Sequence, residues 1–168
     1  MNLKHILLLL LTALYFIIIG AGLWETANVV PVLTKAPPAS FKILQEPYGL
    51  DYVHFWIIMH SVFEVLFLIT VVLYWKNRPM RNKLGLVFLL HMLVRISTFT
   101  YFAPVMLEVF DTPAADAIEP GLYATMKQWQ FFNYMRMGAE LALSFILFSI
   151  IIKYFTTLKS TENESITI

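Results

Sequence analysis

Charged side chains lie in the middle of stretches that are otherwise apolar enough to span a membrane, and this feature constrains the fold most. Glu64, Arg95, Arg136 and Glu140 each lie well inside such a stretch. A charged side chain at the centre of a bilayer costs about 3 kcal/mol, so it is normally buried against a partner within the protein. We therefore expect these four residues to mark the interior of a helical bundle.

Four segments are long enough to cross a hydrocarbon core about 30 Å thick, which takes about 20 helical residues. They cover residues 4–23, 53–75, 84–106 and 129–153. Each should be helical, because a backbone in lipid must satisfy its own polar groups. The predicted fold class is all-α, an integral membrane up-down four-helix bundle. It forms a single domain over residues 1–159, and the polar segment 160–168 is expected to be a disordered cytoplasmic tail.

Basic residues set the expected orientation. The loop over residues 76–83 holds four positive charges and no acid, whereas residues 108–127 hold four acids and one lysine. Because basic loops stay in the cytoplasm, both termini are expected there, in a bacterial-type inner or plasma membrane. The first segment is interpreted as a retained span rather than a signal peptide, since no small-x-small cleavage pattern stands out before Trp24.

Composition excludes several classes of function. The net charge of +1 and the scattered basic residues disfavour nucleic acid as a partner. The absence of cysteine excludes disulfides, thiolate metal ligands and iron–sulfur clusters. No broken helix pair or inverted repeat indicates a transporter. The expected partners are the lipid bilayer and an apolar small molecule, and a homo-oligomer is left open.

Helical geometry converts sequence position into depth. At about 1.5 Å per residue, Glu64, Arg95 and Glu140 each lie about 16 Å into their spans, near the midplane. His60 and Arg136 lie about 10 Å from the outer end. Two acids and two arginines sum to zero formal charge, and ion pairs are the least costly way to bury all four. We therefore expect Glu64 and Glu140 to contact Arg95 and Arg136.

Spacing adds a second constraint. Residues four apart share one helix face, and three pairs of polar residues have this spacing. They are His60/Glu64, His91/Arg95 and Arg136/Glu140.

Three other interpretations of these residues compete with an organic reaction site. Polar contacts between helices can simply fix helix register. Histidine and glutamate are acceptable metal ligands, but no His-x-x-His or Glu-x-x-His pair is present and two arginines would oppose a cation. Haem held by His60 and His91 is disfavoured, because their expected depths differ by nearly 10 Å. No metal and no cofactor are therefore predicted.

Arginine and histidine at pocket depth can hold an oxyanion and exchange its proton. Arginine offers a fixed fork of donors, and histidine titrates near neutrality and can act as a general base. Glu64 beside His60 would orient the ring and raise its basicity. This arrangement suits the deprotonation of a phenol-like or enolisable substrate.

Short motifs lie in order along the chain: Gly20 and Gly22, Asn28-Val29-Val30-Pro31, Thr98 and Thr100 before Ala103-Pro104, and Trp129, Asn133 and Arg136. Their order resembles the anthrone oxygenase-like family of small four-span membrane proteins. The resemblance implies cofactor-independent oxidation of a polycyclic aromatic substrate by O2, through a base-generated carbanion.

On this resemblance His60 is the general base, Glu64 its orienting partner, and Arg136 with Asn133 the oxyanion donors. Arg95 and Glu140 support them, and Asn28 and Glu25 line the entrance. The expected catalytic residues are thus His60, Glu64 and Arg136, and the expected substrate-binding residues are Asn28, His54, Arg95, Asn133 and Glu140. The predicted function is that of an oxygenase-like membrane enzyme acting on an apolar aromatic or quinone-like molecule. The alternative is a non-catalytic binder or carrier, or an accessory subunit of a membrane complex.

Overall fold

The computed structural model describes residues 2–45, 47, 49–51 and 53–166, with side chains described up to Ser160. Every regular element within those residues is a helix, which confirms the all-α prediction. Four of the helical stretches are long enough and apolar enough to cross a membrane. They are Leu3–Leu33, Val53–Leu73, Arg78–Asp111 and Pro120–Ser160.

The N-terminal part of the chain forms one long helix followed by short ones. Helix α1 covers Leu3–Asn28, and the Asn2 side chain caps it by accepting a hydrogen bond from the His5 backbone N–H, 3.3 Å away. Helix α2 follows at Val30–Leu33 with a proline in its first turn, where no N–H is needed. Two further short helices complete the segment, η1 at Ala39–Phe41 and α3 at Lys42–Gln45.

The middle of the chain contains a helix with an irregular turn. Helix α4 covers Val53–Leu73 and helix α5 covers Arg78–Ser97. A π-helical turn, η2 at Thr98–Phe102, joins α5 to helix α6 at Ala103–Asp111. The Ala103 N–H donates to the Thr98 carbonyl five residues earlier. Pro104, which has no N–H to continue an α-helical ladder, follows at once and accounts for the irregularity.

Helix α7, at Pro120–Ile166, is the longest element. The Glu119 carboxylate accepts hydrogen bonds from the Gly121 and Leu122 N–H groups, which lowers its pKa below the usual value. This cap stabilises the start of α7 above the ordinary glutamate pKa and is lost as the pH falls through the lowered value. Helix α7 continues to Ile166, into the tail for which disorder is predicted, and residues 167–168 lie outside the described part.

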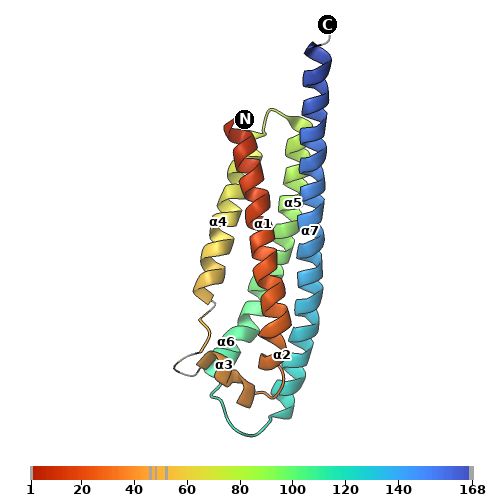
Figure 1. Cartoon of the computed structure of the whole chain (residues 1–168). Coiled ribbons are helices and arrows are strands. Elements are labelled where there is room, and N and C mark those ends of the chain that lie inside the picture. Colours follow the sequence, from red (N-terminus) through yellow and green to blue (C-terminus); the bar gives the residue numbers. More distant parts are fainter. Residues whose placement is uncertain (1, 46, 48, 52, 167–168) are drawn as a thin grey trace.

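The long helices pack lengthwise against one another. Helix α1 contacts both α4 and α7, and α5 also contacts both of them. Figure 1 shows the two chain ends at one end of the elongated molecule and helices α2, α3 and α6 at the other.

Buried apolar side chains form two clusters. The first includes Leu11, Phe63, Phe67 and Leu147, from the long helices. The second lies among the short helices and the start of α7; it includes Val30, Leu33, Phe41, Phe102 and Trp129. A cavity lined by members of both clusters separates them.

Gly22 allows α1 to approach α7 closely. A Cβ atom added there would lie 2.9 Å from the Met137 sulfur and 3.8 Å from the Trp56 ring, whereas one added at Gly20 would meet nothing within 4 Å. Small residues permit such close helix contacts.

We predict that Gly22→Val lowers the free energy of unfolding in detergent by about 1–3 kcal/mol, the usual range for overpacking. The matched variant Gly20→Val should change it by less than about 0.5 kcal/mol. The measurement is denaturant unfolding followed by circular dichroism. Equal losses in the two variants would contradict the packing of α1 against α7.

Candidate functional site

A cavity of about 350 Å³ lies inside the helical bundle, with walls from α1, α4, α5, η2 and α7. Most of its lining is apolar or aromatic, including Ile18, Trp56, Phe99 and Phe102. Six ionisable side chains also line it: Glu25, His60, Glu64, Arg95, Arg136 and Glu140. Five of the predicted site residues therefore meet at one cavity.

The predicted ion pairing is half confirmed. The Arg95 Nε donates to Glu64 Oε1 at 2.9 Å, which joins α5 to α4. The Arg95 guanidinium also lies over the Phe99 ring, 5.1 Å from its centroid. Both side chains are largely removed from solvent, with exposed fractions of 11% for Arg95 and 30% for Glu64.

The Oε2 atom of Glu140 contacts a tyrosine and a histidine instead of the predicted arginine. The Tyr15 hydroxyl donates to Oε2 at 2.6 Å, and His91 Nδ1 lies 3.1 Å from the same oxygen. The physical reason is the direction of Arg136. Its guanidinium extends toward Asn133, one turn before it on α7, whereas Glu140 lies one turn after it.

Arg136 lies among several oxygen atoms and an aromatic ring. It donates to Asn133 Oδ1 at 2.7 Å and to Thr98 Oγ1 at 3.2 Å, and it lies 4.4 Å from the Phe102 ring centroid. Glu25 lines the same cavity as Arg136. The two predicted oxyanion donors, Arg136 and Asn133, therefore contact each other, and the π-helical turn supplies a threonine to Arg136. Their role as oxyanion donors stays a prediction.

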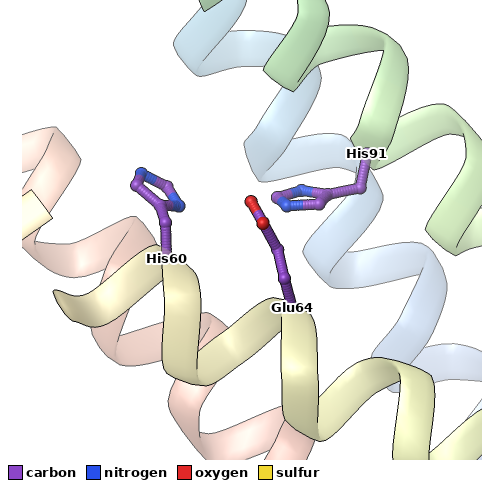
Figure 2. Close-up of side chains that lie close together, drawn as sticks. All are labelled: His60, Glu64 and His91. Atoms are coloured by element: carbon purple, nitrogen blue, oxygen red, sulfur yellow. The ribbon is translucent and has the colours of Figure 1, made fainter. Parts of the chain in front are cut away.

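His60, Glu64 and His91 converge beside the cavity, whose lining includes His60 and Glu64. Figure 2 shows the His60 and Glu64 side chains rising from α4 toward the His91 ring on α5. One potential ligand atom from each residue lies within 4.8 Å of the other two. The predicted depth difference of nearly 10 Å between the two histidines is therefore wrong. Helix α5 begins at Arg78, six residues before the predicted span, so His91 lies deeper than expected.

The predicted support of His60 by Glu64 is also wrong. Glu64 is hydrogen-bonded to Arg95, and the His60 ring stacks on Trp56 with centroids 5.3 Å apart. His60 Nδ1 is buried and has no hydrogen-bond partner among the described residues. The stacking orients the ring, and Nδ1 is left without a partner in the described part of the chain.

Three predicted binding residues, Asn28, His54 and Asn133, lie outside the cavity lining. Asn133 is buried and accepts a hydrogen bond from Arg136, which does line the cavity. His54 is exposed at the start of α4 and pairs with Asp51 at 3.0 Å. Asn28 is exposed at the end of α1, and its side chain donates to the Trp24 carbonyl at 2.9 Å. His54 and Asn28 are both polar residues near a helix end, where solvent and local backbone groups supply partners.

Sequence reasoning missed Tyr15 and gave Glu25 and His91 no role inside the site. A phenol in the middle of the first apolar span was a usable signal for Tyr15, because a buried hydroxyl needs a partner. His91 was placed too shallow, and Glu25 was assigned to the entrance. Thr98 enters the site through the π-helical turn, which the sequence did not predict.

No family model, curated protein or solved structure matches the chain. The anthrone oxygenase-like resemblance therefore stays a prediction, and the chemistry of the site must follow from its own geometry.

The Arg95–Glu64 pair generates a testable energetic coupling. Arg95→Met leaves a largely buried carboxylate without its donor, which should lower the free energy of unfolding by about 1–3 kcal/mol. The double variant Arg95→Met/Glu64→Gln should recover part of that loss, because no charge remains unpaired. Denaturant unfolding of the two single variants and the double variant measures the coupling. Strictly additive losses would show that the two side chains do not interact.

Proposed function

We propose that the chain is an integral membrane protein whose four long helices form an up-down bundle. The outward surface supports this, because large apolar side chains are exposed on all four stretches. Examples are Ile17 at 58% exposure, Ile57 at 59%, Leu93 at 54% and Phe145 at 54%. Lipid is the solvent such a surface needs, since soluble proteins expose only limited apolar patches. The basic loop over residues 76–83 favours cytoplasmic termini.

We further propose that the cavity binds an apolar aromatic or quinone-like molecule bearing an acidic C–H or O–H group. The observation that carries this proposal is an apolar cavity lined by two guanidiniums and by an imidazole with a buried nitrogen that has no partner among the described residues. Ligand pockets typically combine apolar walls with a few convergent polar groups in this way. The aromatic rings of Trp56, Phe99 and Phe102 offer flat surfaces for a planar substrate.

The proposed reaction is base-assisted oxidation by O2. His60 accepts a proton from a methylene group that is conjugated with a carbonyl through an aromatic ring, and the electron pair left on carbon is transferred to O2. Conversion of CH2 to C=O is a four-electron oxidation. O2 accepts those four electrons, so that one oxygen atom enters the product and the other leaves as water with the two substrate hydrogens.

Arg136 is proposed to donate hydrogen bonds to the enolate oxygen that forms when the proton is removed. Its guanidinium is fixed by Asn133 and Thr98, so the donors are positioned before the charge develops. Such preorganised donors commonly contribute about 10²–10³ to a rate. Arg95 keeps its position through Glu64, which makes it a second cation at the same cavity.

We predict that His60→Gln lowers turnover of an anthrone-type substrate by about 10²–10⁴, the usual contribution of a general base. The measurement is O2 uptake by the purified protein in nanodiscs, with product detected by mass spectrometry. His54→Gln is the matched control, because His54 is exposed outside the cavity. It should retain wild-type turnover.

Two outcomes would contradict the proposed enzyme. Equal turnover in His60→Gln and His54→Gln would remove His60 from the reaction. Stoichiometric binding of the aromatic compound by the wild-type protein without any O2 uptake would identify a binder or carrier instead.

A further inference from the structure

The cluster of His60, Glu64 and His91 has the donor set of a metal site. Two imidazoles and one carboxylate hold catalytic zinc in some enzymes and non-haem iron(II) in others. His60 and Glu64 are four residues apart on α4, the spacing at which two ligands on one helix face can reach the same ion. His91 completes the set from α5, as Figure 2 shows.

The tautomer of His91 leaves a nitrogen lone pair directed away from its protein partner. The ring is fully buried, and Nδ1 lies 3.1 Å from Glu140 Oε2. An ionised carboxylate only accepts hydrogen bonds, so Nδ1 carries the proton and Nε2 keeps its lone pair. Nε2 is buried without a hydrogen-bond partner in the described part of the chain. Such a group calls for an explanation, and a bound ion supplies one.

Glu140 and Tyr15 form the outer support that metal-bound histidines require. A ligating histidine almost always donates its other N–H to a carboxylate or carbonyl, which fixes the ring and raises its basicity. Glu140 accepts from His91 in this way and is itself held by the Tyr15 hydroxyl at 2.6 Å.

The two arginines do not exclude a cation from the cavity. Three carboxylates line it, those of Glu25, Glu64 and Glu140, together with the guanidiniums of Arg95 and Arg136. Arg95 is hydrogen-bonded to Glu64 Oε1 at 2.9 Å, so its charge is balanced by a carboxylate.

We propose that His60, Glu64 and His91 bind one divalent first-row transition metal ion, with an open position facing the cavity. Glu64 uses Oε1 for Arg95, and a carboxylate has a second oxygen with which to bind an ion. Two ligands on one ion lie at most about 4 Å apart when each bond is about 2.1 Å. The observed limit of 4.8 Å is closed by small side-chain rotations.

This inference rests on the proposed function, because it concerns the same cavity. It deepens that function by naming the group that accepts the proton from the substrate. With the ion bound, His60 is a ligand, and a metal-bound hydroxide takes its place as the proton acceptor. Zinc lowers the pKa of bound water to about 7, which suits that role. This differs from the cofactor-independent chemistry that the family resemblance implies.

The test is metal binding without substrate, so its result does not depend on the proposed reaction. Purified protein in detergent is stripped with a chelator and titrated with Co²⁺, whose visible ligand-field bands report coordination by nitrogen and oxygen. We expect one Co²⁺ per chain, displaced by Zn²⁺. His60→Gln, Glu64→Gln and His91→Gln should each weaken binding by more than about 100-fold, beyond the usual effect of losing an outer partner.

Three further variants separate a metal site from a structural role. Glu140→Gln should weaken binding by about 10- to 100-fold. Arg95→Met should strengthen it, because a competing positive charge is removed. His54→Gln, which changes an exposed histidine paired with Asp51, should bind as wild type does. Circular dichroism and size-exclusion profiles verify folding, and His60→Gln carries the test if the fully buried His91 variant does not fold.

Absence of stoichiometric Co²⁺ binding by the wild-type protein would overturn the inference and leave the metal-free reaction standing. Unchanged affinity in both His60→Gln and Glu64→Gln would also overturn it, because the ion would then bind elsewhere. Metal binding without turnover of any aromatic substrate would support the site and count against the proposed reaction alone.

Discussion

The Glu140 carboxylate is the interaction on which the site depends most. Its Oε2 atom accepts a hydrogen bond from the Tyr15 hydroxyl of α1 and lies close to Nδ1 of His91 on α5. Side chains from three long helices therefore meet at this atom. A carboxylate in a water-poor interior is tolerated only when its lone pairs are satisfied. The two groups that satisfy it thereby set the spacing of α1, α5 and α7 at the depth of the cavity.

A second set of contacts joins further helices at the same cavity. Arg95 joins α5 to Glu64 on α4, and Arg136 joins α7 to Thr98 on the π-helical turn. The apolar clusters above and below need no such precision, because dispersion and packing act without direction. The polar contacts between the two clusters require precise positions, because hydrogen bonds and ion pairs are directional. The cavity lies where these contacts are concentrated.

Much of the fold was predictable, because a run of about 20 apolar residues has few alternatives to a helix. The ends of the helices were less predictable. In the structure the third stretch extends to Arg78–Asp111, because charged loop residues continue the helix beyond its apolar part. For the site, opposite charges at equal depth predicted Arg95 with Glu64. The same rule failed for Glu140, because depth does not report the direction of a side chain. The convergence of His60 with His91 was missed because sequence position reports neither where the helix of His91 begins nor which way the side chains point.

The most direct test of the account is solid-state NMR of the protein in lipid bilayers, with ¹³C-labelled glutamate and ¹⁵N-labelled histidine and arginine. It measures through-space couplings between the side chains themselves. The account predicts short-range couplings that join the His91 ring to the Glu140 carboxyl carbon and Arg95 Nε to that of Glu64. Absence of both couplings, with these side chains facing lipid or water separately, would contradict a shared cavity built by converging polar groups.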